Sequence, residues 1–179
     1  DGGKKGSTGA LEIRTGDADQ KDLPTAVFDE ILGRELTRAD QPVFIVRVWL
    51  PPFDQWAEGE YCNFGFRQAA RVSDAPEYYP SIWLYYDRRA GPEPFVVFRI
   101  GTGVPDERGK SITQPGWWTL AIAFDQKGVG HYYASPGTEN PIEEKRLFDT
   151  TQFSTKGGRN NPYMERIGYS FFSLIYSSG

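Results

Sequence analysis

The amino-acid sequence predicts an all-β protein, an antiparallel β-sandwich or jelly roll with at most one short helix. Several runs alternate apolar and polar residues with a period of two, which is typical of half-buried strands. Turn-forming residues separate these runs, since the 179 residues include 20 glycines and 13 prolines. Aromatic residues make up 15% of the chain, and large rings favour strands. Together these observations predict roughly eight or nine short strands.

The first segments of the chain are expected to be an arm, a strand and a helix. Residues 1–9 are rich in glycine and lysine and predict a flexible arm. A single domain should follow over residues 10–179, beginning with a short strand over residues 10–14. Residues 24–36 place apolar side chains at helical spacing and predict a short helix, with Thr25 as its N-cap.

Four alternating runs then predict four strands, over residues 43–50, 61–67, 81–87 and 95–100. A further strand, apolar on both faces, is expected over residues 167–176. One face of each alternating run is apolar and should be buried between two sheets. The side chains expected there, with two from the hairpin described next, are Phe44, Val46, Val48, Phe64, Phe66, Ile82, Leu84, Val96, Phe98, Leu120 and Ile122.

Residues 116–137 predict a β-hairpin with its turn at the sequence Asp-Gln-Lys-Gly. The simplest register pairs Phe124 with Val129. This register puts His131 among the bulky apolar side chains of the core face and Tyr132 on the opposite face. A shift by one residue would exchange the two faces. His131 is the only histidine, so a His-rich metal centre is excluded.

The hairpin combines a tryptophan, alternating small apolar residues, a Phe-Asp pair before a glycine, and a later tyrosine and glycine. These positions are Trp118, Ala121, Phe124, Asp125, Gly128, Tyr133 and Gly137. The pattern resembles the hairpin of laminin-G-like domains in the concanavalin A-like lectin/glucanase superfamily, and it spans roughly an eighth of the chain. The resemblance implies two curved sheets whose concave face often binds glycans, commonly with a structural calcium ion. It does not bring the motif Glu-x-Asp-x-x-Glu, whose paired carboxylates glucanases of this fold use for catalysis.

The non-core faces of the strands gather arginine, tryptophan, tyrosine and asparagine. The candidate ligand-binding side chains are Arg47, Trp49, Asn63, Arg67, Trp83, Tyr85, Arg99, Trp117 and Tyr132, with Tyr61 beside them. One interpretation is a solvated sheet face whose aromatic residues reflect strand preference. The other is a platform on which rings stack on sugars while arginine and asparagine bind hydroxyl or acid groups. Three arginines with only Asp87 as an obvious partner favour an acidic or sulfated glycan.

A loop near the N-terminus brings three carboxylates close together, those of Asp17, Asp19 and Asp22. Hard oxygen ligands at such spacing suit calcium, so we expect either a structural Ca²⁺ site or a solvated turn. Cys62 is the only cysteine and lies on an apolar strand face. We expect it to be a small buried side chain.

Composition limits the partners of the chain. A net charge of −4 argues against nucleic acid, because nucleic-acid binding needs a basic surface. No apolar run approaches the ~18–20 residues of a membrane span. We expect Asp1 to follow a processing or cloning junction, in an extracellular or periplasmic protein whose signal peptide has been removed.

These observations favour a non-catalytic carbohydrate-binding or adhesive module, lectin-like, with a glycan or polysaccharide as its partner. Two alternatives stay open. One is a structural subunit that binds other protein chains in a larger extracytoplasmic assembly. The other is a polysaccharide lyase-like enzyme, in which Arg67 and Asn63 neutralise a uronate carboxylate and Tyr85, Tyr132 or His131 removes the adjacent proton.

Overall fold

The computed structural model describes residues 25–55, 62–72, 81–87, 91–99, 107–127, 130–138 and 166–178. For the strands at residues 62–72 and 167–178, only the backbone and its pairing are described. The predicted arm and first strand, and the aspartates of the predicted calcium loop, lie outside the described residues. The calcium site therefore stays a prediction.

The described residues form antiparallel strands with one short α-helix and two 3₁₀ turns. In chain order they are β1 (Thr25–Val27), α1 (Phe28–Leu32), β2 (Leu36–Thr37), η1 (Arg38–Asp40), β3 (Val43–Leu50), η2 (Phe53–Gln55), β4 (Cys62–Val72), β5 (Ser81–Asp87), β6 (Phe95–Arg99), β7 (Glu107–Ser111), β8 (Gly116–Phe124), β9 (Gly130–Pro136) and β10 (Arg166–Ser178). All of the described strand pairs are antiparallel. The all-β, antiparallel class predicted from the sequence is confirmed.

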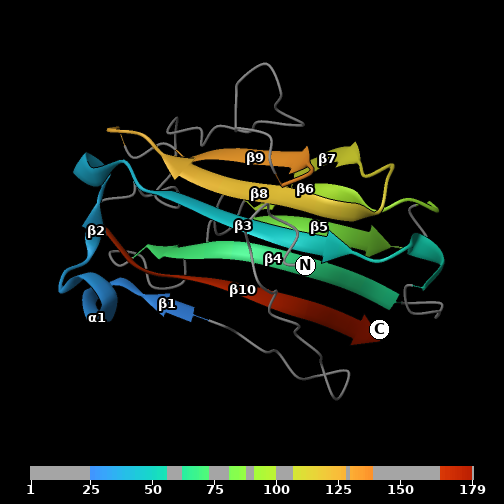
Figure 1. Cartoon of the computed structure of the whole chain (residues 1–179), viewed down its shortest axis with the longest axis horizontal. Coiled ribbons are helices and arrows are strands. Elements are labelled where there is room, and N and C mark those ends of the chain that lie inside the picture. Colours follow the sequence, from blue (N-terminus) through green and yellow to red (C-terminus); the bar gives the residue numbers. More distant parts are fainter. Residues whose placement is uncertain are drawn as a thin grey trace.

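The strands belong to two sheets, which we call sheet A and sheet B. Sheet A has the order β1-β10-β4-β5-β6-β7, with β2 also paired to β10. Sheet B contains three strands in the order β3-β8-β9. In Figure 1, sheet B lies over the part of sheet A that contains β5 and β6. Strands that are consecutive in sequence, such as β3 and β4, are therefore in different sheets.

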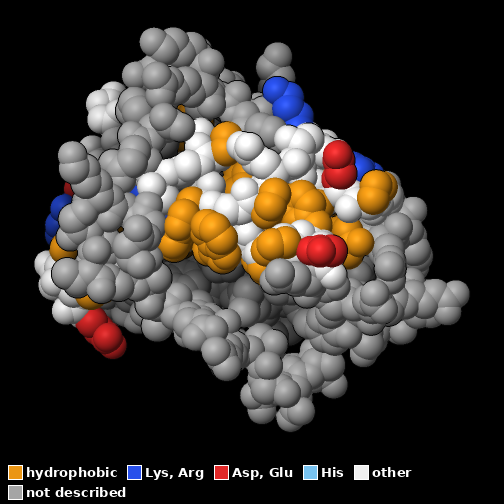
Figure 2. Space-filling view, turned by 45° about the vertical axis from the view of Figure 1, so that its right-hand side comes forward, with side chains coloured by type: hydrophobic (Ala, Val, Ile, Leu, Met, Phe, Trp, Pro, Cys, Tyr) orange, Lys and Arg blue, Asp and Glu red, His pale blue; other side chains and the backbone are white. Residues whose placement is uncertain are grey.

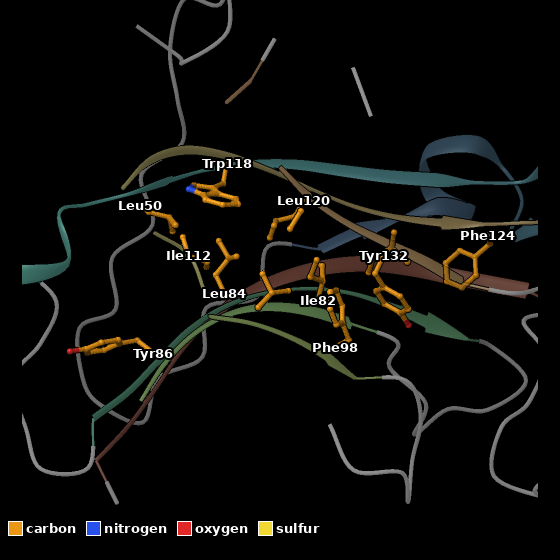
Figure 3. Close-up of a cluster of buried hydrophobic side chains, with 13 residues drawn as sticks. Leu50, Ile82, Leu84, Tyr86, Phe98, Ile112, Trp118, Leu120, Phe124 and Tyr132 are labelled. Carbon is orange, nitrogen blue, oxygen red and sulfur yellow. The ribbon is translucent and has the colours of Figure 1, made fainter. Parts of the chain in front are cut away.

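One cluster of buried side chains receives residues from both sheets, as Figure 3 shows. Phe98 from β6 and Tyr132 from β9 meet edge to face there, with ring centroids 5.7 Å apart. Burying such a side chain contributes about 1.5–3 kcal/mol, so this shared cluster is the main interaction between the sheets. Its members are Leu50, Ile82, Leu84, Tyr86, Val96, Phe98, Ile112, Trp118, Leu120, Ile122, Phe124, Tyr132 and Ala134.

Most of the predicted core side chains occupy this cluster or its border. The predicted residues of β5, β6 and β8 are fully buried: Ile82, Leu84, Val96, Phe98, Leu120 and Ile122. Phe44, Val46 and Val48 of β3 are partly buried and pack against the cluster. The side chains of Phe64 and Phe66 lie outside the description.

The predicted helix is shorter than the sequence pattern indicated. It covers only Phe28–Leu32, between β1 and β2, and Thr25 lies in β1. Gly33 follows with a φ of 68°, a left-handed conformation that ends helices readily. Ile31 and Leu32 are 64% and 52% exposed, so the apolar residues of this helix do not enter the core.

The predicted register of the β8–β9 hairpin is wrong by one residue. Phe124 pairs with Gly130, which leaves one more residue in the turn than the simplest register allows. The Asp125 carboxylate accepts a hydrogen bond from the backbone N–H of Lys127 at 2.8 Å and shapes this turn. Because strand side chains alternate, the shift moves Tyr132 into the core and His131 to the outer face.

Candidate functional site

The predicted ligand face is divided between two sheets. Three of its residues lie on β3 and β8 of sheet B: Arg47, Trp49 and Trp117. Five others lie on β4, β5 and β6 of sheet A: Asn63, Arg67, Trp83, Tyr85 and Arg99. The remaining one, Tyr132, is fully buried in the core. The expectation of one continuous face is therefore wrong, because the order of the strands in the chain is not their order in a sheet.

The outer face of sheet B, directed away from the core, has an ordered set of neighbours. Along β3 the side chains alternate between exposed and partly buried, and the exposed ones are Val43, Ile45, Arg47 and Trp49. The register with β8 places Arg47 opposite Thr119 and Trp49 opposite Trp117. Trp49 is 54% exposed, an unusual amount for so large an apolar ring. In Figure 2 hydrophobic side chains gather where β3 ends, with few charged groups among them.

Trp49 and Trp117 pack against each other across the two strands. Their ring centroids are 5.6 Å apart and their planes are inclined by 67°, an edge-to-face arrangement. The Trp49 ring also lies over Gly116, where an added Cβ would be 3.8 Å from Cζ3 of the ring. Among the described residues, the indole N–H of Trp49 has no hydrogen-bond partner. The ring is therefore supported from below and beside, while much of its surface meets solvent.

Arg47 is held by the segment that follows β9. Its Nε donates a hydrogen bond to the carbonyl oxygen of Thr138 at 3.1 Å. That segment is tied to β8 twice, because Thr119 Oγ1 donates to the Gly137 carbonyl and the Gly137 N–H donates to the Trp117 carbonyl, both at 2.7 Å. Within the described parts of the chain, Arg47 has no carboxylate partner.

Sequence reasoning missed the role of this segment, although it contained one signal. Gly137 has a φ of 90°, which only glycine adopts readily, and it allows the chain to turn sharply after β9. That turn presents the Thr138 carbonyl to Arg47. The glycine was visible in the hairpin pattern, but its contact with a strand some ninety residues earlier was not.

The opposite end of the same face contains the only histidine of the chain. His131 Nε2 lies 3.4 Å from Asp125 Oδ2, and the His131 side chain is 22% exposed. In the register of the sheet, His131 is opposite Ala123, and Ala123 is opposite Val43. The expectation of a core histidine is wrong, for the register reason given above.

The outer side of sheet A contains similar residue types in a buried setting. Trp83 is 9% exposed and donates its indole N–H to Ser81 Oγ at 2.8 Å. Tyr85 lies edge to face with Trp83 at 6.5 Å and with Phe95 at 5.4 Å. The Arg108 guanidinium lies 3.9 Å from the centroid of the Phe95 ring, a cation–π contact. These rings are in use within the protein and offer little surface for a ligand.

The other predicted site residues are placed only in part. Cys62 and Asn63 lie on β4 opposite Ser178 and Ser177 of β10, and their side chains are outside the description. The side chains of Arg67 and Arg99 are also outside it. In the portion of the chain that the structure describes, no three His, Cys, Asp or Glu side chains form a group that could bind a metal ion.

No protein-family model matches this chain, and no curated protein sequence is significantly similar to it. Over the residues that the structure describes, none of the helices is long and apolar enough to cross a membrane. The resemblance to concanavalin A-like domains thus stays a prediction from the hairpin pattern.

Proposed function

We propose that this protein is a non-catalytic carbohydrate-binding or adhesive module that binds a glycan on the outer face of sheet B. The binding residues in this proposal are Trp49, Trp117 and Arg47. The observation on which it depends most is the half-exposed Trp49 ring, fixed against Trp117 beside an arginine that has no described carboxylate partner.

This arrangement suits sugars for a physical reason. A pyranose ring has an apolar face of C–H groups and a rim of hydroxyls, so it can cover an aromatic face while its rim bonds to polar groups. Covering the exposed part of the Trp49 ring removes apolar surface from water, at about 25 cal/mol per Å². Because Trp117 already restricts the ring, little conformational entropy is lost on binding.

The residue types of sheet B favour binding over hydrolysis. Glycoside hydrolysis requires two carboxyl groups that flank the scissile bond. The sequences of β3, β8 and β9 contain neither aspartate nor glutamate. The nearest acid in sequence, Asp125, follows β8 at the end of the sheet opposite Trp117 and lies near His131. The lyase alternative has lost one of its candidate bases, since Tyr132 is buried in the core.

A glycan-binding panel tests the proposal. The wild-type protein should be retained by at least one polysaccharide in affinity electrophoresis, and Trp49→Ala and Trp117→Ala should each weaken that retention. The matched control is Trp83→Phe, which changes a buried ring on the other sheet and should leave retention unaltered. Retention that is equal in wild type and Trp49→Ala would exclude this face as the binding site.

A second candidate function is a structural subunit of an extracytoplasmic assembly. It is favoured by Val43 and Ile45, which are 53% and 48% exposed on the same strand as Trp49. A partner chain that covered them would bury this apolar surface. Sedimentation of wild type and Ile45→Lys over a range of concentrations distinguishes the two functions. An assembly that Ile45→Lys disrupts, without any glycan retention, would favour the subunit. Both candidates imply an extracellular or periplasmic location.

A further inference from the structure

We infer that Arg47 selects a ligand with a carboxylate group, so that the glycan bound on sheet B is a uronic acid polymer. This inference rests on the proposed function, because it assigns the chemistry of the ligand at the same site. It depends on three features of Arg47: its anchoring, its isolation from carboxylates and its spacing from Trp49.

The anchoring fixes which donors of Arg47 face a ligand. A guanidinium group has five N–H donors in one plane. The Nε donor is used on the Thr138 carbonyl, and Thr138 is itself only 8% exposed. The four donors on the two Nη atoms remain at the exposed end of the side chain. Two parallel N–H bonds from such an end match the two oxygens of a carboxylate.

Arg47 is the only charged residue, apart from the titratable His131, in the three strands of sheet B. The sequences of β3, β8 and β9 contain no other arginine and no lysine, aspartate or glutamate. The whole chain has a net charge of −4, so this positive group is not part of a generally basic surface. A single cation within an apolar and polar but uncharged face matches a ligand with one anionic group at that place.

Another arginine of the chain shows what a satisfied guanidinium looks like. Arg34 donates from Nη1 and Nη2 to the two oxygens of Asp40, both at 2.8 Å. This is the two-oxygen geometry that the exposed end of Arg47 would use. For Arg47, no described residue supplies the carboxylate, and the ligand would supply it.

The spacing along β3 relates the cation to the stacking ring. Arg47 and Trp49 are two residues apart on the same face, which separates their Cα atoms by about 7 Å. This distance is comparable with the size of one pyranose ring and its carboxyl substituent. A uronic acid residue can therefore cover Trp49 while its carboxylate reaches Arg47. A planar carboxylate fits the guanidinium fork better than a neutral hydroxymethyl group at the same carbon.

The test compares polygalacturonate with its methyl ester, which has the same backbone without the charge, and extends to alginate. Isothermal titration calorimetry should show that wild type binds at least one of the two polyuronates. The charged form should bind roughly tenfold or more tightly than the ester, because charge-assisted hydrogen bonds are lost on esterification. Added salt should weaken this preference.

Two substitutions of Arg47 separate ligand selection from a structural role. Arg47→Ala removes both the anchor and the fork, whereas Arg47→Gln keeps a donor for the Thr138 carbonyl but removes the charge. Both should lower the affinity for the charged polymer to that for the ester and abolish the salt dependence. Arg47→Gln should do so without a change in thermal unfolding, which makes the result independent of folding defects in Arg47→Ala.

Three results would overturn the inference. If both polymers bind equally well and only Trp49→Ala weakens them, the glycan site stands and carboxylate selection is wrong. Tighter binding of dextran sulfate than of either polyuronate would identify a sulfate ligand instead. If wild type binds no glycan, neutral or charged, the proposed function and this inference fail together.

Discussion

Trp49 and Trp83 occupy comparable positions on the two sheets, yet one is 54% exposed and the other 9%. Each lies on the side of its strand opposite the core, and each has aromatic neighbours. Trp49 contacts Trp117 and leaves its indole N–H without a described partner. Trp83 donates its indole N–H to the fully buried Ser81 hydroxyl. Buried polar groups require such partners, and exposed ones do not.

The comparison teaches that alternation in a strand determines which face a side chain joins but not what covers that face. The aromatic residues of sheet A serve the stability of the protein, with Arg108 over Phe95. The aromatic residues of sheet B meet solvent next to Arg47. The same residue types can therefore stabilise one sheet and bind a ligand on the other.

The largest expected effect is on stability at the buried tryptophan. Trp83→Ala removes a large buried ring and leaves the Ser81 hydroxyl without its partner, so it should destabilise the protein by about 3–5 kcal/mol. Urea unfolding followed by far-UV circular dichroism measures this loss. Trp83→Phe is the conservative control and should cost much less. A loss below about 1 kcal/mol for Trp83→Ala would contradict the burial of this face.

An intermediate effect is expected at Gly116, where β8 begins beneath the Trp49 ring. Its φ of 106° is unfavourable for any residue with a Cβ, so Gly116→Ala should cost about 1–3 kcal/mol. The added Cβ would lie at an ordinary contact distance from Trp49, so the loss should come from the backbone and glycan binding should persist. Ala123→Ser, on the outer face of the same strand, is the control and should unfold like wild type. Loss of binding in Gly116→Ala without loss of stability would count against this explanation.

A smaller effect on stability is expected at the exposed tryptophan. Trp49→Ala should change the free energy of unfolding by about 1 kcal/mol or less, because only the edge-to-face contact with Trp117 is lost from the protein. The same urea experiment measures it beside Trp83→Ala. Equal losses in the two variants would remove the distinction between the two sheets.

The smallest expected effect concerns pH and the corner between α1 and β3. The Arg34 side chain, together with the backbone and hydroxyl of Thr37, holds the pKa of Asp40 well below its usual range. The folded-state pKa is thus lower than the unfolded-state value, so this contribution is present above about pH 4 and is lost as pH falls below it. The groups are exposed, which keeps the effect small.

Thermal unfolding of wild type and Asp40→Asn tests this pH dependence. Wild type should unfold at the higher temperature at pH 7, and the difference should shrink as pH is lowered toward 3. A difference that is constant over this range would contradict the assignment. The corner contains an arginine that already has its carboxylate, so this experiment also serves as the reference for Arg47.

The sequence predicted local structure well where apolar residues alternate without interruption. The bounds of β3 and β5 were predicted correctly from such runs. The strand β7, with the sequence Glu-Arg-Gly-Lys-Ser, was missed because it has no apolar residue to show the alternation. One extra residue in a turn reversed the faces of β9, and with them Tyr132 and His131.

The candidate site could be predicted only in part, for a different reason. Trp49, Trp117 and Arg47 were recognised by residue type, and the structure places them together. Their separation from Trp83 and Tyr85 depends on which strands share a sheet. Such pairing joins distant parts of the chain, as β4 with β10 shows, and period-two patterns contain no information about it.

Oxidative footprinting of the tryptophans, with and without polygalacturonate or alginate, tests the central claim most directly. Hydroxyl radicals modify side chains in proportion to their exposure, and mass spectrometry reads each ring separately. We expect Trp49 to be oxidised faster than Trp83 and Trp118 in the free protein and to be protected by the bound glycan. Trp49 reacting no faster than Trp83, or staying equally reactive at a saturating concentration of a glycan that binds, would contradict the claim that sheet B presents the binding face.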